Sequence, residues 1–171
     1  MITSGIDTSA IIRTVLSEYS LPARGHHGVV HWARVLENGL RMADATGADP
    51  KIVTLFALFH DSRRVNEHKD HGHGTRGGDF ARTLRGTLFE LNDTHFELFY
   101  KACCLHTDGH LKADITVQVC WDADRLDLGR VAITPKPERL CTNAARDILE
   151  WSHERAIHGV EPDFVKLAWG T

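Results

Sequence analysis

A chain of 171 residues with 42% hydrophobic and 25% charged residues has the composition of one ordinary globular domain. The formal charge of −3 and the sequence pI of about 6.4 argue against binding a nucleic-acid polymer through a broad basic surface. A small phosphorylated substrate held by a few local arginines remains compatible with this charge.

The apolar pattern predicts helices along the whole chain. Val29, Leu36 and Leu40 belong to an apolar stripe at helical spacing, which the stretch "ATGADP" interrupts. The pair Asp49-Pro50 is typical of a helix start, and the "KIVTLFALFH" stretch that follows is apolar on nearly every side. We therefore expect this second helix to be buried at the centre of the fold.

The next stretch, "HKDHGHGTRGG", is polar and rich in glycine, which predicts a loop. Further helices are expected over residues 79–91, 93–106, 115–128 and 143–158, and "AITPKPERL" is expected to form a loop before the last of them. Short alternating segments flanked by hairpin turns are missing. The predicted fold class is all-α, a single compact helical bundle formed by residues 1–171.

Several polar residues occur where these helices are otherwise apolar. His31 points away from the core stripe of its helix, and the adjacent His60 and Asp61 end the central helix. Asp124 lies inside an apolar stripe of the helix over 115–128, and Asp122 lies on its other side. A carboxylate in such surroundings is costly unless it is paired or bound to a metal. Imidazole and carboxylate together suit a divalent transition metal.

Histidine is also concentrated, because ten of the twelve histidines lie between residues 26 and 110. The carboxylate of Asp61 could bridge two ions if further histidines approach it. His73 in the glycine-rich loop is one candidate, although a plain surface position is an equal alternative. His106 or His110 in "HTDGH" is the other. His27, one turn before His31, is expected to support the ligands from behind.

The order His31, His60-Asp61, Asp124 resembles the H…HD…D signature of the HD-domain metal-dependent phosphohydrolases. "HWARV", "ALFHDSRR" and "DADRLD" are similar to the three motifs of that family. The resemblance covers about residues 25–131 and leaves a helical extension of about 137–171 outside it. It implies a bundle of the HD-domain type with a central metal site. "HGTRGG" is similar to the stretch that holds a further histidine in two-metal members, which implies His73, followed by His106.

One position departs from two branches of the family. Alarmone hydrolases and deoxyribonucleoside 5′-monophosphatases have a glutamate three residues after the HD aspartate, and this chain has Arg64 there. Arg64 looks closer to the HD-x-x-Lys branch. The further histidine of the deoxynucleoside triphosphate hydrolases is replaced by Val65.

These observations predict roles for a set of residues. One ion is expected on His31, His60, Asp61 and Asp124, and a second on Asp61, His73 and His106. Arg64 and Arg63 are expected to bind the phosphate, because a guanidinium matches its oxygens in a bidentate way, with Arg76 and Arg125 in reserve. Asp122 or Asp70 is expected to handle the proton.

The predicted function is hydrolysis of a phosphomonoester or phosphodiester, of a nucleotide or related metabolite, by attack of water activated on one or two divalent ions. Mn, Fe, Co, Ni and Zn all suit the ligands, whereas Mg alone is disfavoured. An HD-type di-iron oxygenase and a non-catalytic metal- or nucleotide-binding module are the alternatives.

The sequence also gives expectations about location and assembly. Apolar runs stay short of the roughly 20 residues that cross a bilayer, and the first residues show no signal-peptide pattern. We therefore expect a cytoplasmic protein with no membrane contact. Trp151, Phe164 and Trp169 either cover a partner subunit of a homo-oligomer or complete the core.

Overall fold

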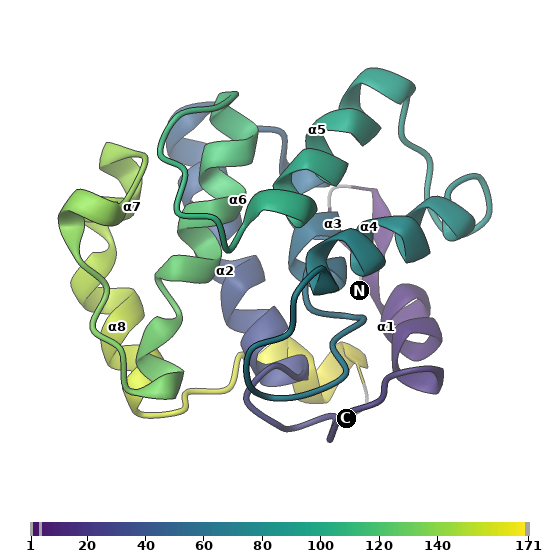
Figure 1. The fold of residues 1–171 in the computed structure, drawn as a ribbon, viewed down its shortest axis with the longest axis horizontal. Helices are drawn as coiled ribbons and strands as arrows, with labels where there is room; N and C mark the ends of the chain where they lie inside the picture. Colours follow the sequence, from purple (N-terminus) through teal and green to yellow (C-terminus); the bar gives the residue numbers. More distant parts are fainter. Residues whose placement is uncertain (1, 4, 170–171) are drawn as a thin grey trace.

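The computed structural model describes residues 2–3 and 5–169, and it confirms the all-α fold class (Figure 1). The helices are α1 (Thr8–Ser17), α2 (Val29–Thr46), α3 (Pro50–Phe59), α4 (His73–Leu84), α5 (Asp93–Leu105), α6 (Ile115–Arg125), α7 (Asn143–Asp147) and α8 (Leu149–Ile157). Shorter helical turns are η1 (Leu128–Val131), η2 (Pro137–Arg139) and η3 (Val165–Trp169). A minimal antiparallel pair, β1 (Ile2–Thr3) and β2 (Ile6–Asp7), precedes α1, an element that the sequence did not predict.

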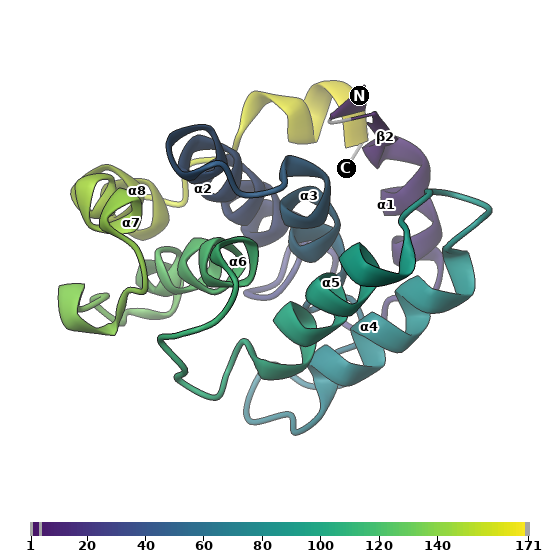
Figure 2. The same cartoon turned by 90° about the horizontal axis from the view of Figure 1, so that it is seen from above.

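Helix α3 forms the centre of the bundle, as its apolar sequence predicted. Residues 52–59 are all buried, and the helix packs against α1, α2, α4, α5 and α6 (Figure 2). Its start is fixed by Asp49, whose side chain accepts a hydrogen bond of 2.8 Å from the Lys51 amide, and by Pro50 in the first turn. A polar residue at the end of this helix is thereby placed deep in the protein.

The prediction of a loop over residues 68–78 was wrong from His73 onward, because α4 begins there. The glycines serve close packing. A Cβ atom at Gly74 would lie 2.0 Å from the Cys103 carbonyl oxygen, and one at Gly77 would lie 2.1 Å from the Phe59 carbonyl oxygen. Only glycine therefore lets the backbone of α4 lie directly against α5 and the end of α3.

Other boundaries also differ from the predicted ones. The helix expected over 79–91 ends at Leu84, and a turn follows in which the Gly86 amide donates to the Phe89 carbonyl over 2.9 Å. The helix expected over 143–158 is divided at Ile148 into α7 and α8. The expected loop before α7 contains the single turn η2.

The C-terminal segment returns to the first helix. The Trp169 indole donates a hydrogen bond of 3.1 Å to the Thr8 hydroxyl, and its ring lies 5.1 Å from that of Phe164. These two aromatic residues complete the core, whereas Trp151 packs against the guanidinium groups of Arg41 and Arg155. A homo-oligomer stays a prediction.

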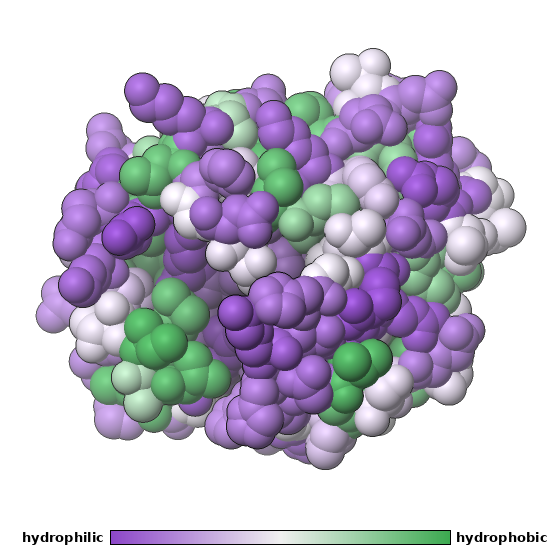
Figure 3. Space-filling model, in the orientation of Figure 1, coloured by the Kyte–Doolittle hydropathy of each residue, from purple (hydrophilic) through white to green (hydrophobic). Residues whose placement is uncertain are grey.

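Across residues 2–3 and 5–169, the structure contains no helix whose length and apolar character would let it span a membrane. The face seen in Figure 3 is hollowed near its middle, between a hydrophobic patch and strongly hydrophilic residues.

Candidate metal centre

The ends of five helices meet at one buried point and carry the predicted ligands there. His31 lies in the first turn of α2, and His60 and Asp61 directly follow α3. His73 is the first residue of α4, and His106 directly follows α5. Asp124 lies in the last turn of α6. A set dispersed over 94 positions of the chain is thus brought together by the bundle.

The first group consists of His31, His60, Asp61 and Asp124. The Nε2 atoms of His31 and His60 lie 3.1 Å apart. The Asp124 Oδ1 atom is 3.4 Å from the first nitrogen and 3.8 Å from the second. The Asp61 Oδ2 atom is 3.6 Å from His31 Nε2 and 3.8 Å from His60 Nε2. Two imidazole nitrogens and two carboxylate oxygens therefore converge, as transition-metal coordination requires.

The second group uses the other oxygen of the same aspartate. Asp61 Oδ1 lies 3.1 Å from His73 Nε2 and 3.8 Å from His106 Nε2, and these two nitrogens are 2.9 Å apart. The Asp61 carboxylate thus stands between two pairs of imidazoles, with one oxygen toward each. This position suits a carboxylate that bridges two cations.

Each of the four imidazoles is held from behind through its Nδ1 atom. His60 Nδ1 lies 3.0 Å from the Phe56 carbonyl, and His106 Nδ1 lies 2.7 Å from the Cys103 carbonyl. His73 Nδ1 is 2.6 Å from the Asp70 carbonyl. Since a carbonyl can only accept, the proton of each neutral ring is on Nδ1, and the lone pair of Nε2 faces the centre. This arrangement behind the ligands is typical of metal-binding histidines.

His31 is anchored by a residue that sequence reasoning missed. Its Nδ1 atom lies 2.7 Å from Oδ2 of Asp127, which is 1% exposed. The same carboxylate accepts hydrogen bonds from Arg34 Nε over 2.6 Å and from Arg34 Nη2 over 3.2 Å. Burial raises the pKa of Asp127, against the lowering effect of Arg34. The available signal was its place in "DADRLD", three residues after Asp124 and directly after a buried helix.

The protonation states of the first group leave the lone pairs of its imidazole nitrogens free. Burial lowers the pKa of His60 to about 4, and burial with nearby Arg130 lowers that of His31 well below its ordinary value. Burial alone would raise the pKa of Asp61, but His60 and hydrogen bonds from neighbouring imidazoles hold it well below its usual range. Burial alone would also raise the pKa of Asp124, but the nearby His60 and His31 lower it.

In the second group, one imidazole has a raised pKa, and the guanidinium of Arg64 lies beside the ligands. Burial lowers the pKa of His106, but its hydrogen bond with Asp61 outweighs that effect and raises it. The guanidinium of Arg64 lies 3.5 Å from Asp61 Oδ1 and 3.3 Å from His73 Nε2. The donor set of imidazoles and carboxylates fits a divalent cation.

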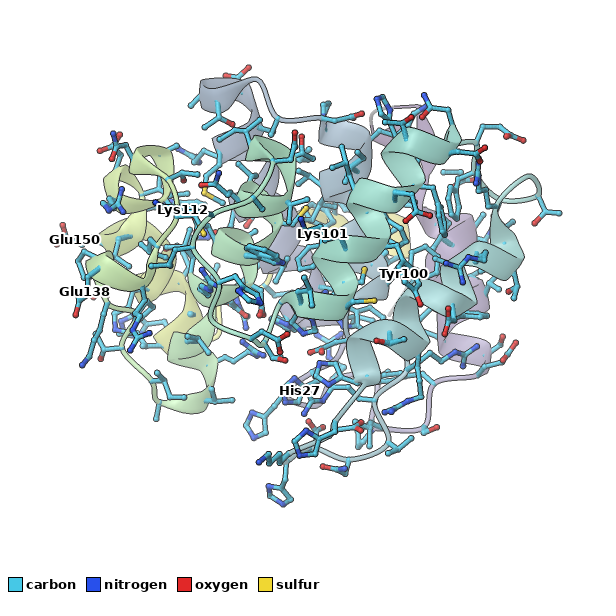
Figure 4. All side chains as sticks on the ribbon, turned by 45° about the horizontal axis from the view of Figure 1, so that its top comes forward. His27, Tyr100, Lys101, Lys112, Glu138 and Glu150 are labelled. Carbon is cyan, nitrogen blue, oxygen red and sulfur yellow. The ribbon has the colours of Figure 1, made fainter. Side chains whose placement is uncertain are left out.

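His27 joins the centre at its edge. Its Nδ1 atom is 2.7 Å from Asp61 Oδ2, and its Nε2 atom is 3.8 Å from Glu67 Oε2. In Figure 4, its labelled side chain lies in the lower part of the view. It is close enough to His31 and Asp61 to form a third possible ligand group with them.

Two aspartates with a predicted role in proton transfer are held by other parts of the protein. Both oxygens of Asp122 accept from the segment after η2: the Cys141 amide at 2.8 Å and the Thr142 amide at 2.9 Å. Asp70 accepts from the Val65 amide and pairs with Arg76. The proton-handling role predicted for Asp122 is therefore corrected, because both of its oxygens accept from backbone amides away from the ligands. Asp70 lines the same cavity as Arg64 and His73, and the role predicted for it stays a prediction.

The arginines predicted to bind phosphate have different contacts. Arg63 donates to Glu18 and lies over the ring of Phe80, with 3.5 Å from the guanidinium carbon to the ring centre. Arg76 donates to Asp70 and to the Arg63 carbonyl. These partners engage both guanidinium groups, and Arg64 alone of the three contacts the centre. The binding role of Arg63 and Arg76 stays a prediction. His110 is 53% exposed at its side chain, so that His106 is the residue of "HTDGH" that reaches the centre.

Cavities reach the centre from three sides. One of about 320 Å³ is lined by His106 and Asp124, and one of about 400 Å³ by Arg64 and His73. The two share Thr107. A third, of about 290 Å³, lies behind His31 and is lined by arginines.

The fold is a helical bundle around a His/Asp cluster that could hold a divalent metal, and comparison with known proteins identifies its family. The family model of the HD domain matches residues 28–129, and the chain belongs to this family. The structure is similar to the crystal structure of a predicted HD superfamily hydrolase from an uncultured Thermotogales bacterium. That likeness has 26% sequence identity and a TM-score of 0.63, and it covers 88% of this chain and 86% of the other. Comparison with the curated proteins gives no match.

Proposed function

We propose that the protein is a metal-dependent phosphohydrolase that cleaves a phosphomonoester or phosphodiester of a nucleotide or related metabolite. The observation that carries this proposal is the position of Asp61, whose two oxygens face two separate pairs of imidazole nitrogens. Membership of the HD family supports the same class, and so does the likeness to a predicted hydrolase of that family.

Six side chains of the protein are assigned as ligands of two ions. We assign one divalent ion to His31, His60, Asp61 and Asp124, and a second to Asp61, His73 and His106, with Mn, Fe, Co, Ni or Zn as the metal and Mg possible. Such ions, when bound, lower the pKa of a water molecule and offset charge on phosphoryl oxygens.

Arg64 supports this centre from the side of the second group. It is 6% exposed and donates to the His68 carbonyl, which keeps its guanidinium beside Asp61 and His73. From this position it lines the cavity of about 400 Å³ and can donate to an oxygen of a bound phosphate. His31, His60, Asp61, His73 and His106 are buried, and the low dielectric around these side chains strengthens each electrostatic contact.

The test is phosphate release by untagged protein loaded with each metal in turn, with simultaneous measurement of oxygen consumption. His60→Ala should lower the rate more than about 100-fold, because a ligand matters more than its supporting shell. His158→Ala is the matched control, since this histidine is 69% exposed at its side chain. Oxygen consumption with iron and no phosphate release would indicate the oxygenase. Metal binding with neither reaction would indicate a binding module.

A further inference from the structure

The cavity of about 320 Å³ is the most direct approach to the centre. It is lined by ligands of both groups, Asp124 and His106, together with Thr107, Leu128 and Arg139. The side chain of Asp124 is 15% exposed, whereas the other five ligands are at most 6% exposed at their side chains. Solvent and substrate therefore meet the centre first on this side.

Two arginines border this cavity, and one of them is bound to the cavity wall. Arg125 donates to the Arg139 carbonyl over 3.1 Å and to the His110 carbonyl over 2.7 Å. Its guanidinium thus joins the two segments that form the cavity wall, and the residue is only 9% exposed. Arg125 therefore shapes the cavity wall, and its guanidinium is held there by the protein.

Arg139 differs from Arg125 in its exposure and in its contacts. It is exposed, and its guanidinium has no hydrogen-bond or ion-pair partner within residues 2–3 and 5–169. A cation that borders a cavity containing a metal-ligand carboxylate, with all its donors free, is available to an anionic ligand.

The backbone that carries Arg139 is nevertheless held firmly. Arg146 donates to the Pro137 carbonyl over 3.2 Å and to the Leu140 carbonyl over 2.7 Å. The Arg139 amide itself donates to the Lys136 carbonyl over 2.9 Å. Glu138, the neighbouring residue in η2, lies at the outer edge of the protein in Figure 4. Only the side chain of Arg139 remains to be ordered by a ligand, which keeps the entropic cost of binding low.

We propose that Arg139 binds the phosphate of the substrate and selects an organic phosphomonoester over a diester, an inference that rests on the proposed function. A monoester has three unesterified oxygens and up to two negative charges, whereas a diester has two such oxygens and one charge. The additional guanidinium therefore favours the monoester. Leu128 provides an apolar wall for the organic part of the molecule.

The test compares manganese-loaded wild type, Arg139→Ala, Arg139→Lys and Lys136→Ala. Lys136→Ala removes the same charge from the same loop, and Lys136 is exposed but does not line the cavity. Steady-state kinetics would use p-nitrophenyl phosphate as monoester and bis-p-nitrophenyl phosphate as diester. Arg139→Ala should raise KM for the monoester about tenfold or more, with a smaller change in kcat. KM for the diester should change less than about threefold. Arg139→Lys should restore part of the loss, and Lys136→Ala should match wild type.

Calorimetric binding of inorganic phosphate to the same metal-loaded proteins gives a readout that needs no turnover. The dissociation constant should rise about tenfold or more in Arg139→Ala and remain unchanged in Lys136→Ala. Absence of ester hydrolysis by wild type would refute the proposed function and leave this binding test in force. Equal phosphate affinity of wild type and Arg139→Ala, or no phosphate binding by wild type, would overturn the role of Arg139. A Tm and metal content equal to wild type would show that each variant is folded and loaded.

Discussion

Replacement of Asp127 by asparagine tests how the centre is supported from behind. Both carboxylate oxygens accept hydrogen bonds, from His31 Nδ1 at 2.7 Å and from Arg34 Nε at 2.6 Å. Asparagine has one acceptor oxygen, and its amide NH2 group would face one of these N–H donors. Asp127→Asn therefore leaves a buried donor without an acceptor and the Arg34 charge without its partner.

The magnitude follows from the burial of this group. Breaking a buried ion pair costs about 3–5 kcal/mol. Burial itself disfavours the charged form of Asp127 and raises its pKa, which offsets part of the stabilisation. We therefore expect the free energy of unfolding of the chelator-treated protein to fall by about 3 kcal/mol. Metal affinity should fall about 10- to 100-fold, because His31 loses the acceptor that fixes its tautomer and orientation.

Urea unfolding and competition with a chelator of known affinity measure the two effects. Asp147→Asn is the matched control, because Asp147 is exposed and the same chemical change there should cost less than about 0.5 kcal/mol. Asp127→Asn with the stability and the metal affinity of wild type would refute the supporting role of this carboxylate.

Three further predictions concern packing, the misassigned aspartate and pH. Gly77→Ala should lower the free energy of unfolding by about 1–3 kcal/mol in urea titrations, since its Cβ would lie 2.1 Å from the Phe59 carbonyl oxygen; an unchanged midpoint would contradict this contact. Asp122→Asn should destabilise the protein by about 2 kcal/mol, through its bonds to the amides of 141–142, yet keep full metal content; metal loss at unchanged stability would contradict that assignment. The pKa of His60 lies at about 4 when folded against an ordinary 6.5, so the unfolded chain takes up this proton first as the pH falls. The unfolding free energy of the chelator-treated protein should therefore decrease by about 3 kcal/mol between these pH values from this residue, and constant stability in urea titrations at pH 7 and 5 would contradict it.

The first ligand group could be predicted from the sequence because its members contradict their local surroundings. His60 and Asp61 end a helix that is otherwise apolar, and Asp124 lies in an apolar stripe. Burial of such polar side chains is costly unless each is paired or bound to a metal. The helical repeat of 100° per residue also placed His31 opposite the apolar stripe of its helix, on a more polar face. His73 and His106 depended more on the family resemblance, since neither position is distinctive in its local sequence.

The sequence predictions were wrong where contacts between distant segments determine the local structure. The glycines near His73 indicated a loop, but Gly74 and Gly77 are needed for close helix packing. Asp122 and Asp124 both belong to a buried helix, and only the loop after η2 shows which of them is satisfied by backbone amides. Long arginine side chains reach several directions from one backbone position, so sequence alone did not separate Arg64 from its neighbours.

The most direct test of the account is the metal content of untagged protein by elemental mass spectrometry. Wild type and the exposed control His158→Ala should hold two equivalents per chain, and His60→Ala and His73→Ala should each hold fewer. One equivalent, lost in His60→Ala and retained in His73→Ala, would contradict the second group. No metal in wild type, even after incubation with manganese or iron, would contradict the metal centre itself.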